Sequence, residues 1–370
     1  MRITAIDAIP ISIPLSRTFS GSGYHVDTRC TVITRITTDE GVVGRIYNGD
    51  NRHHGREIVR IIHEELAPLL VGEDAFAIER HWERMFRISY PNRDHKLVME
   101  AIACVDSALW DTVGRRLGVN VGRLLGGYRS RMPIIAIAGY YEAGKTLADL
   151  EEEMRRLKSV GMAGCKMKVG GLSPAEDAER VAAARAGGGD DFVLAVDANR
   201  GWTRREAIEF AGRIAHLNIE WFEEPCHWYD EAAGMAAVRA RTAIPITAGQ
   251  SEMTLQGVRR LVDAGSVDLV NFDASEGGGV TEWRRIAGLC AAHDVLLAHH
   301  EEPQIAMQLL SAVPHGTYVE CFPDRVRDPI WADLIVNRPD PEEGWIEVPQ
   351  GAGFGLEFDD ELIERFRIDR

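Results

Sequence analysis

The chain has 370 residues, of which 45% are hydrophobic and 27% are charged, and its formal net charge is −15 at pH 7. This length exceeds what one core comfortably buries, so we expect two domains. The acidic balance argues against nucleic acid or an anionic membrane as a partner, because phosphate binding requires a basic surface.

Cysteine usage and apolar runs indicate the compartment. The six cysteines are scattered and form no C-x-x-C pair, which is typical of free thiols in a reducing cytosol rather than of disulfides or a zinc site. The stretch "MRITAIDAIPISIPL" lacks the sustained apolar region of a signal peptide. No apolar run approaches the ~20 residues of a membrane helix. We therefore expect a soluble, cytoplasmic protein.

Residues 1 to about 130 have the pattern of an α+β domain. Strand-like runs at 3–13 and 29–47 come first, and helical patterns follow near 56–70, 74–87 and 95–116. The segment "LLGGY" (124–128) is the expected crossover to the next domain.

Residues 131–330 repeat a short β-rich run followed by an amphipathic helical pattern such as that at 147–160. The runs lie at 133–141, 165–170, 192–199, 220–225, 244–250, 267–274, 295–300 and 317–322. Eight such units predict a (β/α)₈ barrel of the modified TIM type. An open dinucleotide-binding sheet is the alternative, and the lack of a glycine-rich fingerprint after the first strand weakens it. Residues 331–370 leave this rhythm, and "WIEVPQGAGFGLEF" (345–358) reads as strand material returning to the first domain.

The carboxyl ends of barrel strands are where active sites lie. Seven consecutive predicted strand ends carry ionisable or amide side chains: Lys166 and Lys168, Asp197 and Asn199, Glu223 and Glu224, Gln250 and Glu252, Asp273, His299 and His300, and Glu320. A barrel with a purely structural role would not place such groups at seven successive strand ends. We therefore expect an enzyme.

Lys166 and Lys168 point to the same side of one strand, because side chains alternate along a strand. On an exposed edge they would form a solvated face, but a closed barrel has no edge. Like charges in an interior need counter-charges nearby. A divalent cation beside two ammonium groups would lower the pKa of a lysine towards neutrality and make it a competent general base.

A metal site is predicted at three neighbouring strand ends. Asp197 and Glu223 supply carboxylates from successive strands, and Gln250 or Glu252 supplies a third oxygen from the next. Oxygen-only ligation suits Mg²⁺ better than zinc, which favours His or Cys. Opposite the lysines, Asp273 and His300 form a pair in which the carboxylate fixes the imidazole tautomer and leaves the other nitrogen to move protons.

These motifs resemble the enolase superfamily, in particular its mandelate racemase-like branch. The matching segments are "KMK" (166–168), "VDAN" (196–199), "EEP" (223–225), "DASEGGGVTEW" (273–283) and "HH" before "EEPQIAMQLL" (299–310), with "VDSALWDTVGRRLG" (105–118) and "LLGG" (124–127) in the first domain. The resemblance covers essentially the whole chain. It implies abstraction of the proton α to a carboxylate, with the resulting enediolate held on Mg²⁺.

The resemblance also implies residue roles. Lys168 would be the base on one face of the substrate, with Lys166 beside it contacting the carboxylate, and His300 with Asp273 would act on the other face. Asp197 and Glu223 would bind the metal, and Glu320 would hydrogen-bond the substrate carboxylate. The N-terminal domain would cap the barrel, with Tyr24 and His25 as candidate substrate contacts. Asn199, at a barrel strand end, is a further candidate. A homo-oligomer is expected.

Two positions depart from the family pattern. The third metal ligand is usually a carboxylate, whereas the register here gives Gln250, a weaker ligand for a hard cation. Glu252 shares its strand parity, and we favour Glu252 as the source of the third charge. The additional His299 either binds substrate or packs in the core.

We expect dehydration of an acid sugar or related hydroxy acid to a 2-keto-3-deoxy acid. The alternatives are racemisation or epimerisation of a 2-hydroxy acid and, less favoured, a cycloisomerase, which would not need the His300–Asp273 pair. A non-catalytic protein is a further alternative that rests on Gln250 alone.

Overall fold

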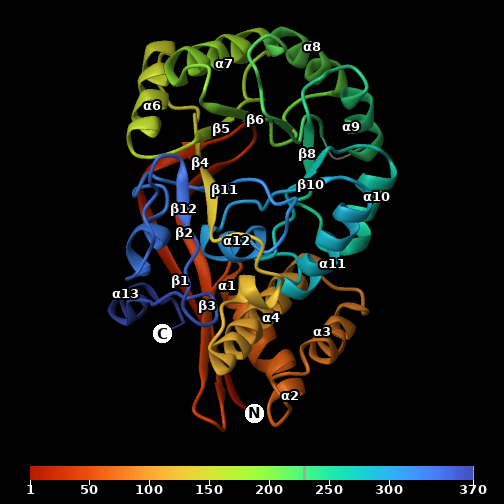
Figure 1. Ribbon diagram of the computed structural model, residues 1–370, viewed down its shortest axis with the longest axis vertical. Coiled ribbons are helices and arrows are strands. Elements are labelled where there is room, and N and C mark those ends of the chain that lie inside the picture. Colours follow the sequence, from red (N-terminus) through yellow and green to blue (C-terminus); the bar gives the residue numbers. More distant parts are fainter. Residues whose placement is uncertain (228–230, 370) are drawn as a thin grey trace.

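An antiparallel sheet of three strands begins the chain. The computed structural model describes residues 1–227 and 231–369, and in it β1 (Ile3–Ser20), β2 (His25–Thr38) and β3 (Val43–Tyr47) pair in the order β1-β2-β3 (Figure 1). The buried isoleucines of β1 and β2 occupy both strand parities, as Ile6 and Ile9 show, so both faces of this sheet are covered.

Helices cover this sheet. They are α1 (Gly55–Ile61), α2 (Ala67–Leu70), α3 (Ile78–Phe86), α4 (His95–Leu117) and α5 (Val121–Leu124). The longest, α4, begins where the Asp94 side chain accepts a hydrogen bond from the amide of Leu97, and it ends at Gly118, whose φ of 68° suits glycine. The predicted α+β order of this segment is confirmed.

Eight parallel strands form the second part of the fold, and one overlaps each predicted β-rich run. They are β4 (Arg131–Ala138), β5 (Gly164–Lys168), β6 (Val193–Asp197), β7 (Phe222–Glu223), β8 (Ile246–Ala248), β9 (Leu269–Val270), β10 (Leu296–Leu297) and β11 (Val319–Cys321). From β4 to β10 each strand pairs with the next one in the sequence, and β11 pairs with β4. Leu297 also bridges Gly316 just before β11, so the curled sheet meets itself. The predicted barrel architecture is confirmed.

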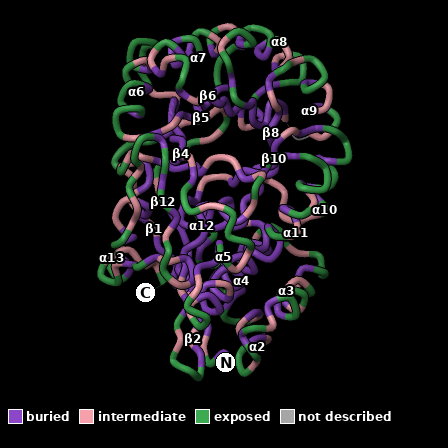
Figure 2. The backbone as a smooth tube through the Cα atoms, viewed as in Figure 1, coloured by how far each residue is buried: buried purple, intermediate pink, exposed green. Residues whose placement is uncertain are grey.

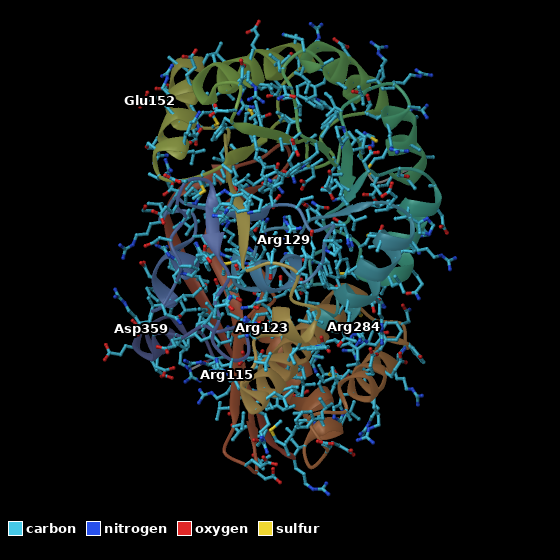
Figure 3. All side chains as sticks on the ribbon, in the orientation of Figure 1. Arg115, Arg123, Arg129, Glu152, Arg284 and Asp359 are labelled. Carbon is cyan, nitrogen blue, oxygen red and sulfur yellow. The ribbon has the colours of Figure 1, made fainter. Side chains whose placement is uncertain are left out.

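Helices surround these strands (Figure 1). They are α6 (Leu147–Ser159), α7 (Pro174–Gly188), α8 (Arg204–Ile214), α9 (Glu231–Arg239), α10 (Leu255–Asp263), α11 (Gly279–Ala292) and α12 (Pro303–Leu310). Three of them, α6 to α8, begin with a capping box in which a Thr or Ser and an acidic residue satisfy each other's backbone amides. Their inner faces are buried and their outer faces exposed (Figure 2), and charged side chains such as Glu152 project outwards (Figure 3).

The C-terminal segment contacts both parts. Its strand β12 (Trp345–Glu347) pairs antiparallel with β4 of the barrel, whereas the sequence predicted that this material returns to the first domain. The return comes slightly later: the amide of Phe354 donates to Asp111 of α4, and α13 (Asp360–Phe366) contacts β1. The division at residues 130 and 330 stays a prediction. No helix in the described ranges is both long and apolar enough to cross a bilayer, and all six cysteines are buried and free.

A buried ion cluster joins the N-terminal sheet to the barrel. Arg29 of β2 is 1% exposed, and its guanidinium lies 3.1 Å from Asp328 Oδ1 and 2.8 Å from Glu302 Oε1. We expect Arg29→Met to lower the free energy of unfolding by about 3–5 kcal/mol, because two buried carboxylates lose their counter-charge. Urea denaturation measures the change.

The matched control is Arg17→Met. Arg17 also joins the sheet to the barrel, through Glu142 and Asp324, but its side chain is 46% exposed. Its loss should cost no more than about 1 kcal/mol. Equal effects of the two substitutions would contradict the importance of the buried cluster.

Candidate active site

A cavity of about 1020 Å³ lies at the carboxyl ends of the barrel strands, beneath the N-terminal part. Strand-end residues supply one wall, among them Lys168, Asn199, Gln250 and His300, and the N-terminal part supplies the other with Tyr24, His25, Arg52, His53, His54 and Lys96. This is the location that the sequence predicted for the site. Tyr24 reaches the lysines, since Lys168 Nζ lies 5.8 Å from the centre of its ring.

Lys166 and Lys168 are buried on β5 and each contacts carboxylates. Lys166 Nζ lies 2.9 Å from Glu223 Oε1 and 2.7 Å from Glu320 Oε1, and Lys168 Nζ lies 2.7 Å from Asp197 Oδ2. Burial opposes the charge of both lysines, but these carboxylates outweigh it and raise the pKa of each. The lowered lysine pKa expected from the sequence requires a divalent cation beside the ammonium groups, and it stays a prediction.

Asp197 and Glu223 lie side by side, because β6 and β7 pair with these two residues in register. Burial and the Asp197 charge raise the pKa of Glu223 to about 7, although Lys166 opposes the shift. Asn199 donates its backbone and side-chain N–H groups to Asp197 at 2.8 and 3.0 Å, which fixes that carboxylate. Crowded, buried carboxylates of this kind suit a cation.

Gln250 and Glu252 are separated by the turn after β8. Gln250 lines the cavity, where Asn271 donates to its Oε1 at 3.5 Å. Glu252, which the sequence analysis favoured as the third charged ligand, instead lies 3.5 Å from Arg260 of α10 and does not line the cavity. Across residues 1–227 and 231–369, no group of three His, Cys, Asp or Glu side chains is placed to hold a metal ion. Of Gln250 and Glu252, only Gln250, a neutral amide, lines the cavity. Glu224 also lines it, but its carboxylate is paired with Arg200.

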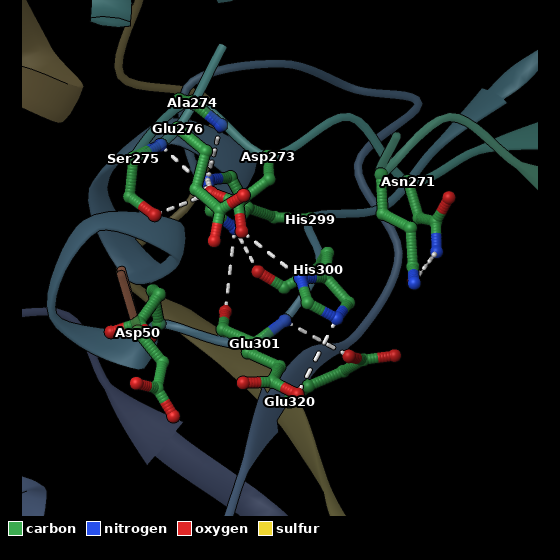
Figure 4. A network of polar contacts seen from close by, with 12 residues as sticks. Asp50, Asn271, Asp273, Ala274, Ser275, Glu276, His299, His300, Glu301 and Glu320 are labelled. Carbon is green, nitrogen blue, oxygen red and sulfur yellow. Dashed lines mark hydrogen bonds and ion pairs between the residues drawn. The ribbon is translucent and has the colours of Figure 1, made fainter. Parts of the chain in front are cut away.

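His300 lies between two carboxylates (Figure 4). Its Nδ1 is 2.9 Å from Asp273 Oδ2, and its Nε2 is 3.4 Å from Glu301 Oε1. Ser275 donates its backbone N–H and its hydroxyl to the other Asp273 oxygen, at 2.8 and 2.5 Å. Burial disfavours the imidazolium, but Glu301 and Asp273 more than offset it and hold the pKa of His300 well above its ordinary value.

His299 has a structural position. It is fully buried, its Nε2 accepts from the amide of Ala274 at 3.1 Å, and its Nδ1 donates to the carbonyl of His300 at 2.9 Å. Both ring nitrogens are therefore used by the backbone, and the side chain does not line the cavity. Of the two expectations for His299, the structure favours packing over substrate binding.

Glu301 contacts His300, and the sequence did not predict this role. It and Glu302 both have a φ of 48°, a left-handed conformation that costs side-chain residues about 1 kcal/mol or more. The turn is held by the Glu301 amide, which donates to Glu320 Oε2 at 3.0 Å, and by the ion pair of Glu302 with Arg29. It aims the Glu301 carboxylate at His300. The signal available in the sequence was an acid directly after the histidine.

Comparison with known proteins identifies the family. The models "Enolase C-terminal domain-like" and "Mandelate racemase / muconate lactonizing enzyme, N-terminal domain" match residues 149–362 and 7–126. The 3,6-anhydro-alpha-L-galactonate cycloisomerase of Streptomyces coelicolor is 32% identical over 98% of this chain and 98% of its own. The arabinonate dehydratase of Saccharolobus solfataricus is 29% identical over 91% of this chain and 90% of its own.

A solved structure agrees with both the fold and the family. It is a mandelate racemase/muconate lactonizing enzyme from a marine actinobacterium in complex with magnesium, with a TM-score of 0.93 and 42% identity. The match covers 100% of this chain and 99% of that one. With its cap-side sheet, its barrel and its strand-end lysines and carboxylates, the chain belongs to the mandelate racemase/muconate lactonizing enzyme branch of the enolase superfamily.

Proposed function

We propose that this protein dehydrates an acid sugar to a 2-keto-3-deoxy acid, starting with removal of the proton α to the carboxylate. The observation that carries the proposal is His300 between Asp273 and Glu301. A histidine held as the imidazolium is equipped to protonate a departing hydroxyl group. The relatives of this chain include a dehydratase and a cycloisomerase. Loss of a hydroxyl group as water needs such an acid.

The donor set fits Mg²⁺. Asp197 and Glu223 are adjacent, buried carboxylates, and Gln250 from the next strand end lines the cavity. These three residues would hold the ion. When bound, it supplies electrostatic stabilisation for the negative charge that develops on the substrate carboxylate.

Different side chains carry out the successive steps of the proposed reaction. Lys168, beneath Tyr24 on the β5 side, removes the α-proton, and Lys166 with Glu320 binds the substrate carboxylate. A cation on Asp197 and Glu223 would take up part of the charge that now raises the lysine pKa. His300 gives its Nε2 proton to the β-hydroxyl as the C–O bond breaks, so that water leaves. Tautomerisation of the resulting enol gives the keto acid.

A racemase is the second candidate, because Lys168 and His300 both line the cavity and would act on opposite faces of one carbon. In that reaction His300 must also serve as a neutral base, which the flanking carboxylates disfavour.

A screen against mono- and diacid sugars tests the proposal. The enzyme is supplied with Mg²⁺, 2-keto-3-deoxy products are detected with a carbonyl reagent, and α-proton exchange in D₂O is followed in parallel. We expect a keto-acid product from at least one sugar. Exchange without product would favour the racemase, and the lack of both would contradict α-proton chemistry.

The third metal donor gives a prediction about affinity. Gln250→Glu should bind Mg²⁺ at least about tenfold more tightly, because carboxylates are stronger ligands than amides for hard cations. Titration calorimetry measures this without turnover. Glu252→Gln is the control and should leave the affinity unchanged. If Glu252→Gln weakens binding and Gln250→Glu does not strengthen it, Glu252 is the ligand.

The Glu301 contact gives a prediction about pH. The raised pKa keeps His300 protonated at neutral pH, and the acid form is lost as the pH rises through that pKa. Glu301→Gln removes one flanking charge, so the alkaline limb of kcat should move to lower pH by about one unit or more. The exposed Glu152→Gln serves as control. An unmoved limb would mean that Glu301 does not influence the catalytic acid.

A further inference from the structure

One wall of the cavity contains a buried arginine without a carboxylate partner among the described residues. Arg327 follows β11, is 4% exposed and lines the cavity. Its Nε donates to the Tyr140 hydroxyl at 3.3 Å, and its guanidinium lies 3.9 Å from the centre of the Phe322 ring. Its Nη1 is buried with no hydrogen-bond partner. Neutral groups thus hold this guanidinium and leave one edge without a partner.

The other buried arginines in the described part of the chain have acidic or carbonyl partners. Three of them contact carboxylates: Arg29 (Glu302 and Asp328), Arg180 (Asp177) and Arg200 (Glu224 and Glu231). The fourth, Arg185, donates to backbone carbonyls, those of Gly189, Phe192, Leu217 and Asn218. A buried charge without such partners is costly, and proteins rarely keep one without a use. Arg327 is therefore placed to receive its counter-charge from a ligand.

Arg327 is not part of the carboxylate cluster around Lys166. Lys166 contacts Glu223 and Glu320, and among the described residues Arg327 forms no ion pair with either of them. Its hydrogen-bond partner is instead the Tyr140 hydroxyl. The Glu301 carboxylate already contacts His300, with its Oε1 3.4 Å from the His300 Nε2. A substrate whose reacting carboxylate lies at Lys166 would thus leave the free edge of Arg327, in the cavity wall, available to a second anionic group.

We infer that Arg327 binds a second carboxylate at the far end of the substrate, so that the preferred substrate is a dicarboxylic acid sugar. The inference rests on the proposed function, which places the reacting carboxylate at the lysines. A planar guanidinium with a free edge matches a carboxylate in two parallel hydrogen bonds. The cavity, at about 1020 Å³, has room for an extended six-carbon diacid.

Binding to matched sugar pairs tests the inference. The Mg²⁺-supplied enzyme is titrated by calorimetry with galactarate and galactonate, glucarate and gluconate, and mannarate and mannonate, whose members differ only at the terminal carbon. We expect the diacid of at least one pair to bind about 10–100-fold more tightly than its monoacid. Arg327→Gln should abolish this preference without weakening monoacid binding, and Arg327→Lys should retain part of it.

Controls separate this role from a structural one. Arg325→Gln alters the same segment at an exposed ion pair with Asp333 and should keep the preference. Arg327→Gln should lower the melting temperature only slightly, because among the described residues the guanidinium makes one hydrogen bond, to Tyr140, and no ion pair. A large fall in its melting temperature would show that Arg327 is structural. Tighter, Arg327-dependent binding of 6-phosphogluconate than of glucarate would assign the site to phosphate instead.

The outcomes also separate this inference from the proposed function. A diacid preference that depends on Arg327, without any keto-acid product, would support the binding site and contradict dehydration. Dehydration of monoacids with no diacid preference would support the reaction and overturn the binding site. Failure of all three pairs to bind would overturn it as well.

Discussion

Lys168→Met should lower kcat by about 10²–10⁴-fold and abolish exchange of the substrate α-proton with D₂O, because it removes the general base. The side chain is buried on β5, faces the cavity and contacts Asp197 at 2.7 Å. Exchange is the decisive readout, since it reports proton removal whether or not a later step completes. The product assay and the exchange assay should fall together.

The matched control is Lys158→Met. Lys158 ends α6 on the outer surface, where it contacts Asp191 at 2.6 Å, and its loss should leave both assays unchanged. Lys168→Met also leaves Asp197 without its ammonium partner, so circular dichroism and a melting curve should accompany the kinetics. A folded Lys168→Met protein that still exchanges the α-proton would assign proton removal to another group.

Much of this site could be predicted because strand parity and strand order determine it. Side-chain alternation places Lys166 and Lys168 on one face, and neighbouring parallel strands bring Asp197 beside Glu223, so positions in the sequence translate directly into positions in the barrel. The eight strands could be predicted from a different signal, because each lies at a short apolar run between helical patterns.

The side-chain directions that could not be predicted belong to residues in the turns after the strands. Gln250 and Glu252 have the same parity, but the chain has left β8 at Ala248, so alternation no longer determines which residue faces the cavity. The direction of Glu301 depends on a left-handed turn, and the direction of Arg327 on a segment after β11 without regular structure. Such turns are held by long-range contacts, including the ion pair between Glu302 and Arg29, which no local pattern reports.

His300→Asn should abolish dehydration while leaving α-proton exchange in place. Exchange requires only Lys168 on its own face, whereas loss of the β-hydroxyl requires the acid at His300, which supplies about 10²–10⁴-fold. The substitution leaves Asp273 hydrogen-bonded to Ser275, so the carboxylate keeps partners. The experiment measures keto-acid formation and deuterium incorporation on the substrate identified by the screen.

This result distinguishes the three reactions open to the fold. A dehydratase loses product formation but keeps exchange, because the two events occur on different side chains. A racemase loses conversion from both enantiomers, and exchange survives only for the enantiomer that Lys168 deprotonates. A cycloisomerase keeps its activity, because that reaction does not need the His300–Asp273 pair. His299→Asn is a poor control, since both ring nitrogens of His299 hydrogen-bond the backbone. The matched control is His54→Asn, which changes an exposed imidazole at the cavity and leaves the His300–Asp273 pair intact. Retained dehydration in His300→Asn would therefore remove the acid from this mechanism, and with it the main support for a dehydratase.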